Sequence, residues 1–270
     1  MFSHEDRCIY QKNQLAEVIC QLRFPEILSI QATLPAVFQD AIRDEYPRYS
    51  SRQETPAPKL AGTPGNMSLQ KQEPITNIQF ASADGAWRVN LTSRVISLSC
   101  SRYTCWEDFA KRLDKPLAAF IQTYHPAFFE RVGLRYVNFF SRKELGLEGT
   151  PFSEMFSPCY LGILAEEDVL EANASRCSVD TEMALRGGCR VQLHAGPGLV
   201  KRGGQQDSEV KFVFDQDLFM PGQLPGNLSA GALQTLHRQA DTIFRDAITD
   251  TLHNAMEPEA KGGKQCSLNG

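Results

Sequence analysis

The chain has 270 residues and a formal net charge of −4, from 28 lysines and arginines against 32 aspartates and glutamates. Hydrophobic residues make up 42% and charged residues 22%, the balance of a globular protein with a substantial core. The acidic balance disfavours a nucleic-acid partner, because proteins dedicated to that task carry an excess of basic residues.

Two further features of the sequence bear on its location. No apolar run reaches the roughly 18 to 20 residues that span a bilayer, so we expect no membrane partner. The N-terminal stretch MFSHEDRCIYQKNQ carries acids and does not resemble a secretory signal. We therefore expect a cytoplasmic protein.

Eight cysteines are scattered along the chain without a CxxC pair. In a reducing compartment we expect Cys20 and Cys100, which lie within strand patterns, to be small buried hydrophobic residues. A structural zinc site needs clustered ligands, and the spacing here supplies none. The sequence predicts no cofactor.

The first part of the chain predicts several strands and one helix. Apolar and polar side chains alternate with a period of two over residues 15–24, 75–80, 87–91 and 95–100. Thr33 can cap a helix over residues 34–46. The stretch 47–74 is rich in Pro, Ser and Gln and has almost no large apolar residue, so we expect a mobile insertion. A plain linker and a loop that orders on a partner both fit this composition.

The clearest helix pattern begins at residue 104. A capping box from Thr104 to Glu107 can satisfy the first backbone donors, and apolar residues then recur at three- and four-residue steps up to Tyr124. Pro116 lies inside this pattern. We expect it to kink the helix or divide it in two.

The next stretch, FFERVGLRYVNFF over residues 128–140, predicts the central strand. Val132 and Leu134 fall on one face, whereas Arg131 and Arg135 fall on the other and flank a glycine. Aromatic and β-branched residues dominate this stretch, which is typical of a strand inside a sheet rather than at its edge.

The second half predicts further strands, over residues 160–164, 178–185, 190–195 and 209–214. The glycine-rich stretch 196–204 predicts a turn, and an apolar stripe predicts a final helix over 232–256. We expect the polar tail 257–270 to be disordered. The whole predicts an α+β fold, an antiparallel sheet in two loosely related lobes (1–140 and 141–256) packed against long amphipathic helices.

Five segments, taken together, match a pattern seen elsewhere: LAEVICQLRFP (15–25), FQDAIRDEYP (38–47), VNLTSRVISLSCSRYTCWEDF (89–109), ERVGLRYVNFF (130–140) and LHRQADTIFRDAITDTLHNAM (236–256). The chain resembles a sporadically distributed bacterial family of conserved proteins without an assigned activity. The resemblance implies a cytosolic bacterial protein and supplies no catalytic residue. The patchy distribution of that family implies a link to mobile or defence genes.

Arg131 and Arg135 are the main candidates for a recognition surface. Two residues apart on one strand face, they lie about 7 Å apart and could hold a carboxylate or a phosphate. The alternative is cross-strand pairing with Glu17 or another acid. Lys201 and Arg202, in the glycine-rich stretch, could help to cradle an anion, and a flexible hairpin loop is the alternative there.

A metal-dependent enzyme, a nuclease or a transferase, is the competing hypothesis. Asp215 and Asp217 form a D-x-D pair after an apolar strand, a pattern with which some glycosyltransferases hold a metal. Asp180 with Glu209 and Lys211 fits a loose D…E-x-K pattern of metal-dependent nucleases. Both patterns recur by chance, and solvated turn residues are their more common explanation.

We expect a non-enzymatic binding or assembly module with a protein partner. The polar sheet face and the stretch 47–74 would carry recognition, and formation of a homodimer through the final helix is a third alternative.

His237 and Asp241, one helical turn apart, indicate a surface pair. The enzyme hypothesis requires its acids and Lys211 to converge in one concave pocket.

Overall fold

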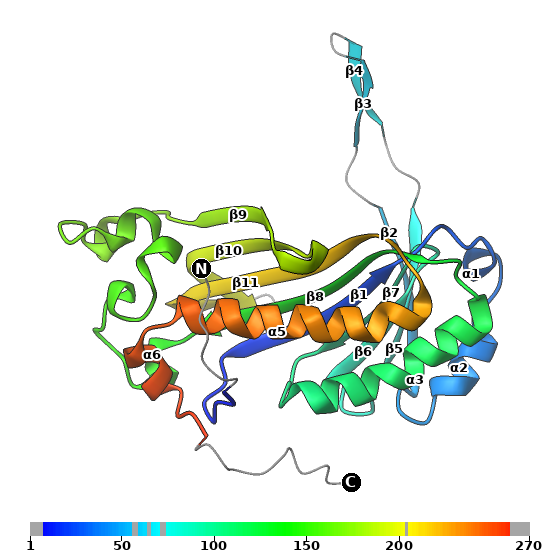
Figure 1. Cartoon of the computed structure of the whole chain (residues 1–270), viewed down its shortest axis with the longest axis horizontal. Coiled ribbons are helices and arrows are strands. Elements are labelled where there is room, and N and C mark those ends of the chain that lie inside the picture. Colours follow the sequence, from blue (N-terminus) through cyan, green and yellow to red (C-terminus); the bar gives the residue numbers. More distant parts are fainter. Residues whose placement is uncertain (1–7, 56–58, 64–65, 71–73, 203–204, 260–270) are drawn as a thin grey trace.

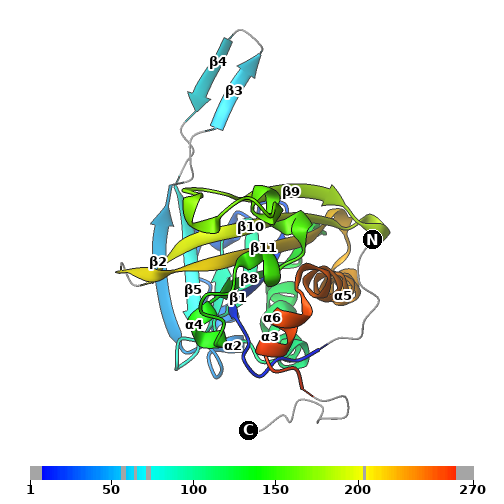
Figure 2. The same ribbon diagram turned by 90° about the vertical axis from the view of Figure 1, so that its left-hand side faces the viewer.

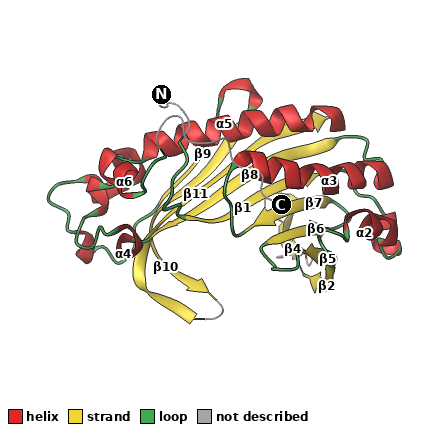
Figure 3. Cartoon of the chain, turned by 90° about the horizontal axis from the view of Figure 1, so that it is seen from below, coloured by secondary structure: helices red, strands yellow, loops and turns green. Residues whose placement is uncertain are grey.

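In a computed structural model, the chain forms a nine-stranded antiparallel sheet with two long helices on the same face (Figures 1 and 3). The structure describes residues 8–55, 59–63, 66–70, 74–202 and 205–259. In spatial order the strands are β2 (Arg48–Glu54), β5 (Ile75–Ala81), β6 (Trp87–Leu91), β7 (Val95–Cys100), β1 (Leu15–Arg23), β8 (Phe129–Phe140), β11 (Gln205–Leu224), β10 (Arg190–Arg202) and β9 (Val179–Ala184). The predicted α+β class and antiparallel sheet are confirmed.

Strand β8 lies at the centre of this sheet. It pairs with β1 on one side and with β11 on the other, antiparallel to both. Val132 and Leu134 on its inner face are fully buried, as the alternation predicts. Because the strands of the first half extend from β1 and those of the second half from β11, both predicted lobes share this one sheet.

Helix α3 (Trp106–Tyr124) packs its apolar stripe against the sheet and against α2 (Ala36–Ile42), at one end of the molecule (Figure 1). Phe109 and Phe120 on this stripe are fully buried. The helix continues through Pro116, so the predicted division into two helices is wrong.

Helix α5 (Ser229–Ala247) lies across β8 and β11 on the same face, with Leu236 and Ala240 buried (Figure 3). The predicted final helix is not continuous: Ile248 is extended and bridges to Phe156, and α6 (Asp250–Ala255) begins after it. Among the described residues, no large exposed hydrophobic side chain belongs to α5. The stripe that suggested self-assembly is therefore covered by the sheet.

The stretch 47–74 contains strands where a loop was expected. Strand β2 pairs with β5 at the sheet edge, and β3 (Lys59–Thr63) pairs with β4 (Asn66–Gln70) in a two-stranded arm that projects from the body (Figures 1 and 2). In both strand pairs the residue numbers of two paired residues add up to the same value, as for Arg48 with Ala81 and Lys59 with Gln70. The arm therefore continues the β2–β5 hairpin in the same register. The sequence did not predict these strands because β2 is exposed along nearly its whole length and has no apolar face to reveal it.

Two further stretches differ from the sequence prediction. Residues 160–164 form 3₁₀ turns, η2 (Pro158–Tyr160) and η3 (Gly162–Ala165), where a strand was expected. Strand β10 runs through the predicted turn at 196–204 as far as Arg202. A Cβ atom on Gly196 would lie 2.5 Å from the Cys177 carbonyl oxygen, so this glycine permits close packing where a turn was expected.

The two ends of the described chain meet. Glu259 N–H donates to the Ile9 carbonyl at 2.9 Å, and Lys12 Nζ lies 2.8 Å from Glu257 Oε1. The first residues of the predicted disordered tail are thus paired, whereas 260–270 lie outside the described residues. Among the described residues, none of the helices combines the length and hydropathy needed to cross a membrane. Cys20 and Cys100 are free and fully buried, as predicted.

Removing the β3–β4 arm is expected to leave the sheet intact. We predict that deleting residues 56–73 and joining Thr55 to Pro74 through Asn-Gly shifts the thermal midpoint by less than about 4 °C, because β3 and β4 pair with each other and with no other strand of the described residues. Circular dichroism would measure this. A fall of more than about 10 °C would show that the arm stabilises the body.

Candidate functional site

The sheet face opposite α3 and α5 carries charged side chains on four neighbouring strands, β8, β11, β10 and β9. We call it the charged sheet face and define it by Arg131, Arg135, Asp180, Glu182, Arg190, His194, Asp215 and Asp217. These residues alternate with buried neighbours that face the helices, such as Leu134 and Leu218. The period of two thus separates a charged face from the core along each strand.

Arg131 is held tightly on this face. Its Nη2 atom donates to both carboxylate oxygens of Asp217, each at 2.7 Å, and its guanidinium carbon lies 4.4 Å from the centroid of the Phe219 ring. A Cβ atom on Gly133 would overlap Arg131 Nη1, so the side chain lies directly over this glycine. The side chain of Arg131 is only 13% exposed, so it serves to position Asp217 rather than to contact solvent.

Arg135 forms the second pair. Its Nε donates to Asp215 Oδ1 at 2.8 Å and its Nη2 to Asp215 Oδ2 at 2.5 Å, the fork geometry that suits a carboxylate. This carboxylate raises the pKa of Arg135 above its ordinary value. Cross-strand pairing, the alternative left open by the sequence, is therefore what the structure shows, and the partners are Asp215 and Asp217 rather than Glu17. Both guanidinium groups already hold a carboxylate of the chain itself.

The edge of the charged sheet face is more exposed. Arg190 Nη2 donates to Glu182 Oε1 at 2.7 Å, and His194 Nδ1 lies 2.7 Å from Asp180 Oδ1. Hydrogen bonds from Gln192 and Arg190 lower the pKa of Glu182, and the hydrogen bond with His194 lowers that of Asp180. Both edge carboxylates are therefore ionised at neutral pH.

A shallow depression of about 480 Å³ lies between these edge residues and the first pairs. Its charged and polar lining consists of Arg135, Asp180, Thr181, Glu182, Gln192, His194, Asp215 and Asp217. Four carboxylates face one guanidinium group there, so the local charge is acidic.

The residues of the enzyme hypothesis do not converge. Asp215 and Asp217 hold arginines, as described above. Glu209 accepts hydrogen bonds from Ser141 Oγ at 2.7 Å and from Lys143 N–H at 3.1 Å, and Lys211 pairs with Asp207. Within the described part of the chain, no three His, Cys, Asp or Glu residues are placed to hold a metal ion.

Residues 196–202 of the predicted anion cradle are extended along β10, whereas residues 203–204 lie outside the described residues. Lys201 is exposed near the tip of the β10–β11 hairpin and stands opposite Gln206, while Arg202 stands opposite Gln205. Backbone groups of an extended strand point alternately to its two sides, so they do not converge on one anion.

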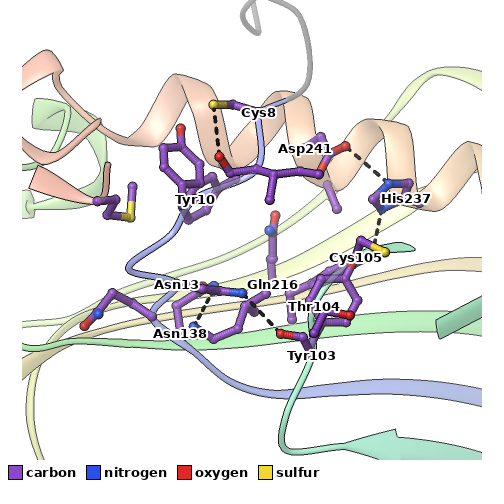
Figure 4. A pocket seen from close by; sticks show the side chains of 17 residues that line it. Cys8, Tyr10, Asn13, Tyr103, Thr104, Cys105, Asn138, Gln216, His237 and Asp241 are labelled. Carbon is purple, nitrogen blue, oxygen red and sulfur yellow. Dashed lines mark hydrogen bonds and ion pairs between the residues drawn. The ribbon is translucent and has the colours of Figure 1, made fainter. Parts of the chain in front are cut away.

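The sequence analysis missed a pocket on the other face of the sheet, beneath α5 (Figure 4). It has a volume of about 80 Å³ and is lined by Asn138 and Gln216 from the sheet and by His237 from the helix. Each of these three residues is 2% exposed. The signal was present, because Asn138 and Gln216 interrupt otherwise apolar inner rows of β8 and β11.

His237 pairs with Asp241, as the helical spacing predicts, but it does so from a buried position rather than at the surface. Its Nδ1 atom lies 2.8 Å from the Tyr136 hydroxyl, and its Nε2 atom lies 3.3 Å from Asp241 Oδ2. The imidazole stacks on Trp106 with ring centroids 4.5 Å apart. These contacts fix the ring as one wall of the pocket.

Comparison of the chain with protein-family models and with curated proteins finds no match. The candidate sites therefore rest on their own geometry.

Gly133 provides a direct test of the Arg131–Asp217 pair. We predict that Gly133→Ala lowers the free energy of unfolding by about 1 kcal/mol, because the new methyl group displaces the guanidinium and leaves Asp217 without its partner. In an Arg131→Ala background the same change should be neutral or stabilising, because alanine suits a strand better than glycine. Urea denaturation of all four proteins measures the cycle. Equal losses in both backgrounds would refute this account of Gly133.

Proposed function

We propose that the chain is a non-enzymatic binding module of the bacterial cytosol, which takes a protein partner on the charged sheet face. The observation that supports this most is the uncovered face itself: four adjacent strands present charged side chains that are already held in place by one another. The link to mobile or defence genes rests on the sequence resemblance alone.

The arrangement suits a protein surface. The charges alternate in sign and extend over several strands, which favours a broad partner over a small ligand enclosed on all sides. Because ion pairs fix the side chains beforehand, less rotamer entropy is lost on binding. Three arginines stand against four carboxylates on this face, so a phosphate backbone would gain little from it.

The exposed edge of this face determines which chemistry of partner it favours. The side chains of Asp180 and Glu182 are 69% and 45% exposed, whereas that of Arg131 is 13% exposed. The outer carboxylates can therefore contact basic side chains of the partner. The Arg131–Asp217 and Arg135–Asp215 pairs hold the side chains of the inner strands in position. Complementary charges at the rim of an interface increase the association rate and determine how strongly that rate depends on salt concentration.

Removing the two edge carboxylates is expected to weaken binding selectively. Asp180→Asn with Glu182→Gln keeps the side-chain shapes and removes two charges. We predict that a partner captured from the native cytosol and then purified binds this variant at least tenfold more weakly, with a shallower salt dependence. Isothermal titration at several salt concentrations would measure both quantities.

A matched control is available elsewhere on the chain. Asp40→Asn with Glu54→Gln removes the same charge from two exposed ion pairs that do not belong to the charged sheet face. This control should bind like the wild type. If both variants bind equally weakly, the effect comes from the overall charge of the protein and not from this face. If the edge variant binds with wild-type affinity, the proposed surface is wrong.

A further inference from the structure

The pocket beneath α5 lies on the helix-covered face and is separate from the charged sheet face. α5 forms its roof with His237 and Asp241, β8 and β11 form its floor, and the residues that lead into α3, such as Thr104, form a side (Figure 4). The segment from Cys8 to Leu15 closes it further. Its lining mixes apolar side chains, such as Phe244 and Met256, with the polar groups of Asn138, Gln216 and His237.

Gln216 is the feature of this pocket that the fold does not explain. Its Oε1 atom is buried and has no hydrogen-bond partner among the described residues. In Figure 4 the side chain rises from the sheet into the space beneath the helix. A buried acceptor without a donor costs about 1 to 3 kcal/mol, so a position that needed only packing would favour leucine or methionine.

The surroundings of Gln216 are already ordered. Tyr136, its neighbour across the strand pair, holds His237 Nδ1 at 2.8 Å, and Asn138 Nδ2 donates to the Phe214 carbonyl at 3.2 Å. Asp241 is the one acidic residue of this lining, and the described lining contains no lysine or arginine. A neutral ligand with hydrogen-bond donors fits this lining better than an anion does.

We infer that this pocket binds a small carboxamide through the side chain of Gln216. A carboxamide donates an N–H to the glutamine oxygen and accepts from the glutamine nitrogen, so one ligand group satisfies both ends of the side chain. The pairing is symmetric and holds for either orientation of the Gln216 amide. The cavity volume of about 80 Å³ is several times the roughly 10 to 15 Å³ of cavity that a single water needs, which leaves room for a molecule of a few heavy atoms such as acetamide.

Acetamide is the probe that tests this inference. In the full chain labelled with ¹⁵N-glutamine, titration should give a saturable shift of the Gln216 side-chain amide signal, with a Kd on the order of millimolar, as so few atoms allow. Gln216→Leu should reduce acetamide binding at least tenfold. In the absence of ligand, this variant should be as stable as the wild type or more stable, because it removes the unpaired acceptor.

Gln53→Leu is the control, since Gln53 is an exposed glutamine on β2, at the edge of the sheet, and lines neither this pocket nor the charged sheet face. It should bind acetamide like the wild type. A wild-type Gln216 signal that does not saturate, or one that contacts only long-lived water, would overturn the inference. So would unchanged binding by Gln216→Leu. The titration of the wild type decides the question even if that variant does not fold, and its result is independent of the proposed protein partner.

Discussion

The antiparallel pairing of β8 with both β1 and β11 is the constraint on which the other features depend. A strand in the middle of a sheet must place every second side chain in the core, so Val132 and Leu134 face the helices while Arg131 and Arg135 face outward. The inner row supports α5. The outer row supplies two guanidinium groups, and β11, the next strand, supplies their carboxylates.

The two arginine–aspartate pairs differ in what they contribute. Arg135 is the more exposed arginine, so solvent screens its pair with Asp215, and we expect this pair to add little to folding stability. Arg131 lies over Gly133, against the Phe219 ring, and loss of its guanidinium would leave Asp217 partly buried without a partner. This is why the exposed edge carboxylates, rather than Arg131, are suitable for testing a binding surface by mutation.

Much of the fold could be predicted because most strands have one buried and one polar face. The period of two located β8 to within a residue, and the apolar repeat located α3, although the N-cap of this helix is Cys105 rather than the predicted Thr104. Prediction failed where burial does not follow a simple period. Strand β2 is exposed along nearly its whole length, and residues 160–164 form 3₁₀ turns in which Tyr160 and Leu164 are buried while Ile163 is exposed. The partners of Arg131 and Arg135 could not be predicted, because they lie about eighty residues away, on a strand whose neighbour in the sheet no local pattern specifies.

The triplet Asp215-Gln216-Asp217 shows how closely the two sides of the sheet are linked. Successive residues of a strand point to opposite faces, so the two aspartates hold the arginines of the charged sheet face while Gln216 enters the pocket beneath α5. A shift of β11 by one residue along β8 would place both carboxylates in the core and the glutamine outside. The ion pairs therefore fix the register that holds Gln216 beside Tyr136. In the sequence, the D-x-D pattern suggested a metal site. In the structure, its two aspartates fix the register of β11 against β8, with the charged sheet face on one side of the sheet and the pocket beneath α5 on the other.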